Sequence, residues 1–525
     1  MNVLIFDIDS LRQDHLGCYG YDRPTSPTID AIADAGVRFD DCYVSNSPCL
    51  PSRTALVTCR RGIKTGVVTH EGEGQWYESP GSGHDPDDDR ITSFRLLSET
   101  GIRTASVSSF SQRHLAPHFA GAFRETIQPT AQTGLEGGGD VTDAAVRWLR
   151  STVDNGSDAD DWLLHLNYWD VHLPYEDVES FVDSVRGDGP PPGLPDEDLI
   201  ERHRSMTGPR TANLWPTPRN LSDETHGQFR EDAWEMPTDE LDRETVEHVV
   251  DGYDSSVQKA DAEIRAVLDE LERLGIRDET VVVVTADHGE AFGEHGLYGT
   301  HGMAHPATQR VPLIVSWPGT DDDMAGTATD AMVYQFDLMA TLCDLFDIPI
   351  PDGWDARPFT PALSGIEFDG REFVVCGHGT QTLSRALYTD DWLYVQLVHP
   401  GVFSFPGTFN DTSLPAEGLE LLHARDGDPH HAENLVVEKP AVAKRLRRTM
   451  AEWTADQLRT PDAAGTDPLV EMATNEGPFI YVRPDELRAL YAERGELAEH
   501  AAILDRSETA FPRPLADLGD ARLPQ

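Results

Sequence analysis

The most distinctive chemistry in this chain belongs to the run Cys49-Leu50-Pro51-Ser52-Arg53. C-x-P-S-R is the pattern that maturation enzymes recognise when they oxidise a cysteine to formylglycine, an aldehyde residue. The hydrated aldehyde is a geminal diol. One of its hydroxyls can attack a sulfate or phosphate ester, and the other can expel the bound group as the carbonyl re-forms. A loop cysteine before a proline turn could have the same five residues. The assignment of Cys49 as a formylglycine precursor therefore depends on motifs elsewhere in the chain.

A second group of candidate residues follows the apolar runs that we expect to be strands. Asp9 comes just after the run 3–8, and Asp287 and His288 come just after the run 281–285. Ligands of open α/β sheets bind at the carboxyl ends of the strands, so we expect these side chains to meet there. Two carboxylates and an imidazole suit Ca²⁺, Mg²⁺ or Mn²⁺. Such an ion beside the diol would lower the pKa of a hydroxyl and neutralise the developing anion.

The elements that must position these residues alternate in type along the chain. Apolar runs at 3–8, 162–166, 281–285 and 312–317 predict strands, and the helical spacing of apolar residues in 257–274 predicts an amphipathic helix. This alternation predicts an α/β fold with a mostly parallel central sheet flanked by helices. Short strands at 373–376 and 392–397 and a helix at 442–458 predict a smaller C-terminal α+β domain.

We therefore expect three parts: a catalytic domain over 1–367, a C-terminal α+β subdomain over 368–460 and an extension over 461–525. Within the first part, the Gly/Pro-rich and polar stretch 186–245 is expected to be an insertion over the sheet and a candidate lid. The acidic stretch 77–92 is expected to be a solvated loop.

Charge and composition bound the partners and the compartment. The 525 residues include 42 lysines and arginines against 92 aspartates and glutamates, a net charge of −50. Such a surface repels nucleic acid and anionic membranes. Four of the cations are lysines, a balance typical of proteins that work at molar salt, where screening is strong. We expect a halophilic protein. The chain has no apolar stretch of about 18 residues and opens without signal-peptide features, so we expect it in the cytoplasm. Its six scattered cysteines do not form a disulfide framework.

Several segments together resemble the sulfatase family of the alkaline-phosphatase-like superfamily. In chain order they are 2–20, 49–56, 167–175 (NYWDVHLPY), 278–299 (DETVVVVTADHGEAFGEHGLYG), 310–314, 385–395 and 421–435 (LLHARDGDPHHAENL). Their order and spacing match the family over roughly residues 1–460.

The resemblance implies roles for several residues. Cys49 would become the formylglycine nucleophile, which requires a formylglycine-generating enzyme as a partner. Arg53 would hydrogen-bond the diol, His172 would protonate the leaving group and Asp287 would accept a proton from the attacking hydroxyl. The implied metal ligands are Asp9, Asp287, His288 and the modified Cys49, with Ca²⁺ the first expectation and Mn²⁺ or Mg²⁺ as alternatives. The implied substrate is a small-molecule or saccharide sulfate ester.

The chain departs from the family pattern at the substrate-binding positions. Ser10 follows Asp9 where the family often has a second aspartate, which leaves Asp7 either a ligand or a buried, hydrogen-bonded carboxylate. Two expected lysines are missing, one near 101–114 and one at Thr300. Substrate charge would then be met by His70, His114, His301 or Arg113. These departures keep two alternatives open: a phosphodiester or phosphonate-monoester hydrolase with the same nucleophile, and a non-catalytic anion-binding protein.

Overall fold

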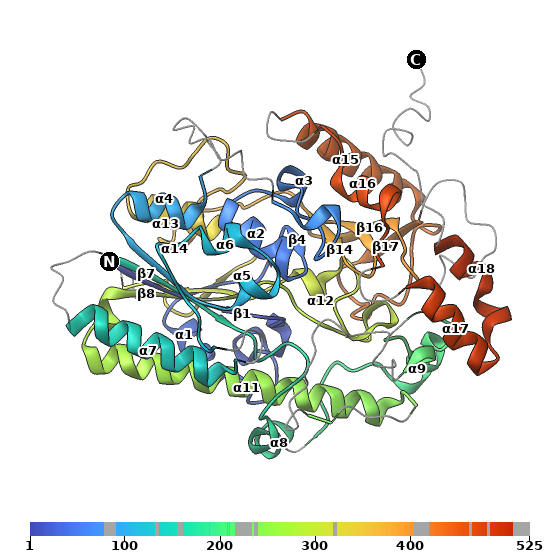
Figure 1. Ribbon diagram of the computed structural model, residues 1–525, viewed down its shortest axis with the longest axis horizontal. Helices are drawn as coiled ribbons and strands as arrows, with labels where there is room; N and C mark the ends of the chain where they lie inside the picture. Colours follow the sequence, from blue (N-terminus) through green and yellow to red (C-terminus); the bar gives the residue numbers. More distant parts are fainter. Residues whose placement is uncertain are drawn as a thin grey trace.

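The computed structural model describes residues 1–77, 91–131, 136–154, 161–187, 189–206, 208, 210–215, 234–235, 240–318, 323–403, 419–460, 465–479 and 483–507. Two sheets organise this part of the chain, a large one at the centre and a smaller one toward the C-terminal helices (Figure 1).

The large sheet has the strand order β12-β2-β11-β8-β1-β7-β5-β6. All neighbouring strands pair in parallel except β11, which runs antiparallel to both β8 and β2. The three middle strands are buried along nearly their whole length, as expected for continuous apolar runs covered on both faces. The mostly parallel α/β sheet predicted from the sequence is confirmed. The strands are β1 (Asn2–Ile8), β2 (Val37–Phe39), β5 (Arg103–Val107), β6 (Glu125–Ile127), β7 (Trp162–Tyr168), β8 (Thr280–Ala286), β11 (Leu313–Ser316) and β12 (Thr327–Thr329).

Helices cover both faces of this sheet (Figure 1). One face carries α1 (Pro27–Asp34), α7 (Gly138–Asp154) and α11 (Arg243–Leu274). The other carries α2 (Cys49–Thr58), α4 (Ser93–Glu99), α5 (Phe110–Arg113), α6 (Pro117–Ala120), α13 (Asp337–Leu345) and α14 (Thr360–Leu363).

Helix α11 is longer than the helix predicted over 257–274. It begins after Asp242, whose side chain accepts a hydrogen bond from the backbone of Thr245, and it ends at Gly275 with φ of 72°. Its first half buries Asp251 and Asp254, and both carboxylates pair with Arg23 at 2.8 Å. The same half also buries Val246, Val249, Val250 and Tyr253 at helical spacing. The apolar periodicity therefore extends upstream of residue 257, and the predicted start of this helix was too late.

The smaller sheet has the order β17-β16-β15-β14-β4. Its C-terminal members are β14 (Val374–Gly379), β15 (Leu383–Tyr388), β16 (Trp392–His399) and β17 (Leu419–Ala424), and α15 (Pro440–Leu458) packs against them. The predicted strands at 373–376 and 392–397 and the helix at 442–458 are present. The edge strand β4 (Asn46–Ser47) comes from the N-terminal region and pairs with Gly377 and His378 of β14. The smaller sheet is therefore joined to the chain immediately before Cys49.

The insertion and the C-terminal extension are described in part. Within 186–245, residues 188, 207, 209, 216–233 and 236–239 lie outside the described ranges, so the lid stays a prediction; most of the acidic stretch 77–92 lies outside them too. Helix α8 (Glu179–Arg186) leads into the insertion, whose described part includes α9 (Glu197–His203). The extension forms α16 (Pro468–Asn475), α17 (Pro484–Arg494) and α18 (Leu497–Ser507). Tyr491 of α17 bonds to Asn213 of the insertion at 3.2 Å, so these two segments meet.

Remaining short elements are β3 (Cys42–Tyr43), β9 (Ala291–Phe292), β10 (Tyr298–Thr300), β13 (Val333–Tyr334), α3 (Gly62–Thr65) and α12 (Pro306–Gln309).

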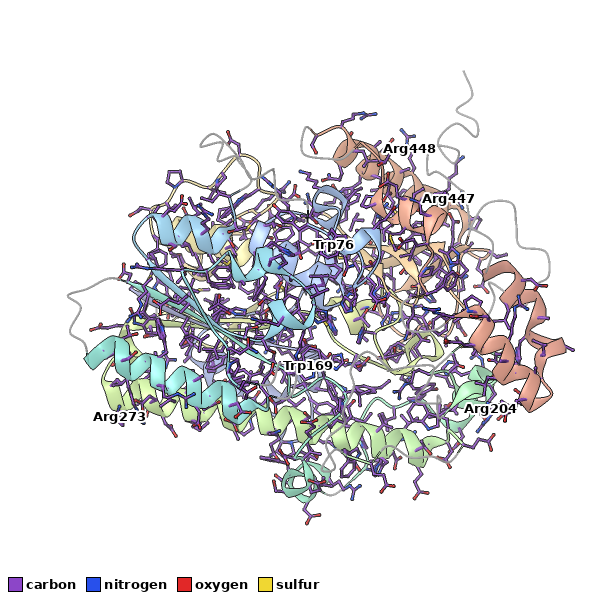
Figure 2. The ribbon with its side chains drawn as sticks, in the orientation of Figure 1. Trp76, Trp169, Arg204, Arg273, Arg447 and Arg448 are labelled. Carbon is purple, nitrogen blue, oxygen red and sulfur yellow. The ribbon has the colours of Figure 1, made fainter. Side chains whose placement is uncertain are left out.

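In the part of the chain that the structure describes, no helix combines the length and apolarity needed to cross a membrane. Figure 2 shows Arg204, Arg273, Arg447 and Arg448 at the periphery, where each pairs with a glutamate. Trp169 lies near the middle of the same view.

Candidate active site

Three neighbouring strands end in register at one edge of the large sheet. Ile8, the last residue of β1, pairs with Tyr168 of β7 on one side and with Ala286 of β8 on the other. The residues that follow, Asp9, Asp287 and the segment 169–172, therefore leave the sheet side by side. Parallel pairing brings together side chains that lie more than 100 residues apart in the sequence, as the position of a ligand site in such sheets requires.

Helix α2 brings Cys49 to this edge. Cys49 is the first residue of the helix, directly after β4 and Pro48, and every residue of α2 is buried. Arg53 lies four residues later, so its side chain lies on the same face of the helix, one turn away. The positive end of the helix dipole also favours negative charge at Cys49.

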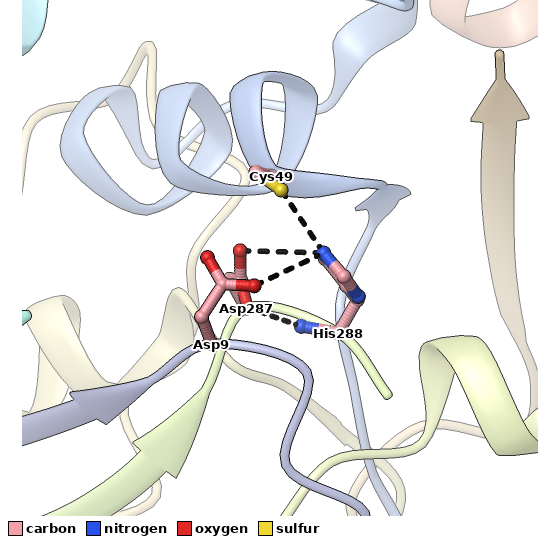
Figure 3. Close-up of side chains that lie close together, drawn as sticks. All are labelled: Asp9, Cys49, Asp287 and His288. Carbon is pink, nitrogen blue, oxygen red and sulfur yellow. Dashed lines mark hydrogen bonds and ion pairs between the residues drawn. The ribbon is translucent and has the colours of Figure 1, made fainter. Parts of the chain in front are cut away.

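Cys49, Asp9, Asp287 and His288 face one another (Figure 3). Their ligand atoms all lie within 4.8 Å of one another, and all four residues are buried. Nε2 of His288 lies 3.1 Å from Sγ of Cys49, 3.7 Å from Oδ1 of Asp9 and 3.6 Å from Oδ2 of Asp287. Nδ1 of His288 lies 2.9 Å from the carbonyl oxygen of Gly289, which can only accept a hydrogen bond. Nδ1 therefore carries the proton, and Nε2 turns its lone pair toward the two carboxylates, as in a metal-binding histidine.

Arg53 is fully buried and joins three carboxylates. Its Nε donates to Asp7 at 2.9 Å, and its Nη1 donates to Asp9 at 2.8 Å and to Asp287 at 2.5 Å. With all three carboxylates ionised, as metal binding requires, one guanidinium would leave two negative charges in excess, the charge that a divalent cation balances. The donor set and its charge therefore fit the divalent ion expected from the sequence.

Asp7 lies beside this group rather than in it. One of its oxygens is 3.2 Å from Nε2 of His165, and both contact Arg53. The geometry favours the second of the two roles considered for Asp7, a buried carboxylate that holds Arg53.

Burial and neighbouring charges compete to set the protonation of the site. It acts to raise the pKa of Asp9, but Arg53, with His172 and His288, outweighs it and the pKa is lowered. Burial, opposed by Arg53 and reinforced by Asp9 and Asp7, raises the pKa of Asp287 well above its usual range. Burial, Asp9 and Asp287 likewise raise the pKa of the Cys49 thiol.

A neutral thiol is a poor nucleophile. Sγ of Cys49 marks the position where an oxygen of hydrated formylglycine would lie, and that oxygen would face His288 and the carboxylates.

The predicted histidines lie in two pairs near Cys49. The ring of His301 is 4.6 Å from that of His288 and 5.4 Å from that of His172. On the other side, Nε2 of His70 accepts the backbone N–H of Leu50 at 3.3 Å, and the ring of His114 lies 4.8 Å from that of His70. Each predicted site residue is thus placed near the nucleophile, while the assignment of roles to them stays a prediction.

The lysines do not reach the site. Lys64 pairs with Asp355 and Lys259 with Asp170, each at 2.7 Å. The two others flank or belong to α15. Imidazoles and arginines, not lysines, are therefore the basic side chains that the described residues place near Cys49.

Two further residues of the site were missed by the sequence analysis. Trp169 stacks on His172 with ring centres 4.4 Å apart, and the guanidinium carbon of Arg113 lies 3.8 Å from the centre of the Trp169 ring. Glu290 is buried with its carboxylate 3.6 Å from His301. Both lie inside segments already singled out, 167–175 and 278–299, but their contacts depend on chain pairing that no local pattern encodes.

Comparisons with known proteins agree with the fold. The family model described as "Sulfatase" matches residues 1–348. Human arylsulfatase A is 24% identical over 517 residues, which cover 91% of this chain and 93% of the relative. N-acetylglucosamine-6-O-sulfatase of Bacteroides thetaiotaomicron is 23% identical over 417 residues, 69% of this chain and 70% of the relative. The phosphonate monoester hydrolase of Agrobacterium radiobacter shares the fold, with a TM-score of 0.63 at 17% identity, over 87% of this chain and 96% of that structure.

Proposed function

This chain belongs to the sulfatase family, and we propose that it hydrolyses sulfate esters with formylglycine, formed from Cys49, as the nucleophile. The observation that carries the proposal is the position of Cys49, at the buried start of α2 and within 4.8 Å of the candidate ligand atoms of Asp9, Asp287 and His288. A side chain held there at the positive end of a helix, next to an excess of carboxylates, is suited to a metal-assisted attack on an anionic ester.

Asp9, Asp287 and His288 would hold a divalent ion together with the modified side chain at position 49. Bound there, the ion would lower the pKa of a hydroxyl on formylglycine and neutralise charge on the sulfate oxygens. We propose Ca²⁺ because two of the three protein ligands are carboxylates. The single imidazole is the feature that would favour Mn²⁺ instead.

The other side chains divide the remaining tasks. Arg53 stays charged at any working pH and keeps both Asp9 and Asp287 in place through its Nη1. We assign Asp287 to accept the proton of the attacking hydroxyl and His172 to deliver a proton to the leaving oxygen.

His172 is suited to that role by its tautomer. Its Nδ1 donates to the carbonyl oxygen of Leu173, so Nε2 is left to receive a proton. Burial lowers the pKa of His172 to about 3. An anionic ester bound beside the ring would raise that pKa again, because it stabilises the imidazolium.

The substrate class that we propose is a saccharide or other small-molecule sulfate ester. A relative named for action on N-acetylglucosamine 6-O-sulfate supports the saccharide. Trp169, half-buried beside His172, adds an aromatic surface next to the leaving group.

A second candidate function is hydrolysis of phosphodiesters or phosphonate monoesters by the same nucleophile. The specific observation in its favour is that both lysines described within the catalytic part are paired with aspartates away from Cys49. Comparing kcat/KM for matched aryl sulfate and phosphodiester substrates separates the two. We expect the sulfate to be preferred; a preference above about a hundredfold, some 2.7 kcal/mol of transition-state binding, excludes the second candidate.

The test of the proposal is the chemical state of Cys49. Peptide mass spectrometry of native protein should show the mass loss that converts a cysteine side chain to an aldehyde, and Cys49→Ala should abolish turnover of a chromogenic aryl sulfate. If native, active protein carries only the thiol, the diol mechanism is wrong. If fully matured protein turns over no sulfate ester, a non-catalytic anion-binding role takes its place.

The setting of the protein is part of the proposal. We propose a halophilic, cytoplasmic protein that is matured by a formylglycine-generating enzyme and binds no nucleic acid. The net charge of −50 supports a halophilic protein that binds no nucleic acid. The free state of all six cysteines supports a reducing compartment.

A further inference from the structure

Four histidines outside the group of Asp9, Cys49, Asp287 and His288 gather where the smaller sheet meets the loop that carries His301. We call His295, His305, His423 and His431 the histidine cluster. Their side chains are 5%, 0%, 1% and 8% exposed. His295 and His305 flank β10 in the catalytic part, whereas His423 lies on β17 and His431 in the loop after it. A backbone hydrogen bond of 2.9 Å from His295 to His430 holds the two loops together.

The spacing of three of these rings matches that of imidazoles around one ion. The ring centres of His295, His423 and His431 lie 5.0, 5.0 and 5.1 Å apart in pairs. An ion bound at about 2.1 Å from each nitrogen lies about 3.2 Å from each ring centre, so a tetrahedral angle places two rings about 5 Å apart. His305 lies 5.4 Å from His295 and is the nearest candidate for a fourth ligand.

The hydrogen bonding of the cluster is incomplete without a further atom. Neither nitrogen of His305, neither nitrogen of His423 and not Nδ1 of His431 has a hydrogen-bond partner in the described part of the chain. Buried polar nitrogens normally have partners, so the cluster calls for a bound ion or water.

There is room and compensating charge for an ion. A pocket of about 20 Å³, lined by His295, His423, His431 and neighbouring residues, has space for one ion or one water molecule. The carboxylate of Asp428 lies 3.7 Å from Nδ1 of His423, the arrangement of a carboxylate that supports a metal-binding histidine. Glu294, beside His295 in sequence, adds a second carboxylate that is already paired with Arg12 at 2.7 Å. Arg202 also lines the pocket.

From these observations we propose that the histidine cluster is a second metal site, bound by His295, His423 and His431 and specific for a transition-metal ion of the Zn²⁺ type. Imidazole ligands without carboxylates select such ions over Ca²⁺ or Mg²⁺. Within the described residues, only Asp9, Cys49, Asp287 and His288 already place their ligand atoms within 4.8 Å of one another. The histidine cluster does not meet this distance, so its imidazole rings would rotate when they bind an ion. The ion would fix the segment 423–431 against the loop 294–305, and thereby the wall of the active site that carries His301.

The experiment uses Co²⁺ as a visible probe of a histidine site. Full-length protein is stripped with a chelator, saturated with Ca²⁺ to fill the oxygen-rich site, and titrated with Co²⁺ while visible absorption is recorded. We expect one equivalent of Co²⁺, displaced by Zn²⁺, with the intense bands of a tetrahedral site. His288→Gln should leave this uptake unchanged, because His288 belongs to the other site.

Matched variants identify the ligands. His423→Gln and His431→Gln should each weaken Co²⁺ binding about tenfold or more. His203→Gln is the control, because His203 lines the same pocket but bonds to the hydroxyl of Tyr298 at 2.7 Å; its affinity should match the wild type. If Ca²⁺-saturated wild-type protein takes up neither Co²⁺ nor Zn²⁺, the cluster holds water and the proposal fails. If the ligand variants misfold, X-ray absorption of wild-type protein with Co²⁺ decides, since a carboxylate-rich shell overturns the assignment.

Discussion

Replacing Asp7 with asparagine separates the two roles open to this carboxylate, metal ligand or support for Arg53. Asp7 is fully buried, accepts the Nε of Arg53 at 2.9 Å and lies 3.2 Å from Nε2 of His165. Asparagine has nearly the same shape but carries no charge. It can still accept one hydrogen bond from Arg53, so the substitution removes the charge and leaves the packing in place.

The structure sets the expected loss of stability. A hydrogen bond to a charged group contributes about 1.5–3 kcal/mol. Removing one partner of a buried ion pair costs about 3–5 kcal/mol when it strands the other charge. Arg53 keeps Asp9 and Asp287, so it is not stranded, and the loss of one of three mutually repelling carboxylates offsets part of the cost. We expect the free energy of unfolding of the metal-free protein to fall by about 1–2 kcal/mol.

Metal affinity discriminates between the two roles. Because Asp7 acts through Arg53, Asp7→Asn should weaken Ca²⁺ binding by about tenfold. Asp9→Asn removes one of the four clustered ligands and should weaken it by about a hundredfold or more, some 2.7 kcal/mol.

Titration calorimetry with Ca²⁺ and urea unfolding measure the two quantities on the same samples. Asp337→Asn is the matched control, because Asp337 is equally buried and paired with an arginine, Arg371, outside the site. It should lower stability and leave Ca²⁺ affinity unchanged. If Asp7→Asn loses Ca²⁺ as completely as Asp9→Asn, Asp7 is a ligand and the role assigned to it here is wrong.

Three other predictions test separate parts of the structure. Hydrogen bonds from two half-exposed arginines lower the pKa of Glu270 from 4.5 to about 2, so its stabilisation is present above pH 4.5 and is lost as the pH falls through 2. Glu270→Gln should therefore lower stability by about 1 kcal/mol at pH 7, with the difference from wild type shrinking below pH 4.5 in urea unfolding; a difference independent of pH would contradict this. Asp467→Asn breaks a buried two-bond contact with Arg385 at 2.8 and 2.9 Å, at about 3 kcal/mol, and should speed limited proteolysis at the start of α16. Equal cleavage rates would mean that other contacts hold the extension. A Cβ at Gly289 would lie 2.1 Å from a backbone carbonyl oxygen, so Gly289→Ala should shift the turn that carries two candidate ligands and lower kcat/KM at least about tenfold. Gly139→Ala, whose Cβ would have its nearest neighbour at 3.7 Å, should match the wild type.

The sequence was sufficient to predict the fold class, the middle strands and the family. Central parallel strands are buried on both faces, so they appear as continuous apolar runs that need no knowledge of their neighbours. The residues with distinctive chemistry lie in short motifs at strand and helix ends, and Cys49, Asp9 and Asp287 could be identified for that reason.

Other features depended on contacts between distant segments. No local pattern predicted that Cys49 and Arg53 lie on one turn of a helix. The smaller sheet was expected after residue 367, whereas β4 joins that sheet just before Cys49. The pairing of the buried aspartates of α11 with Arg23 likewise depended on the fold.

What the sequence by itself determined is the set of reactive groups and the strands that end beside them. What only the tertiary structure decided is which groups meet: Asp7 with Arg53 and His165, and the histidines of 295–305 with those of 423–431. The physical reason is that local pattern records which face of an element is apolar, whereas the charge, burial and pKa of a site arise from segments that the fold brings together across hundreds of residues.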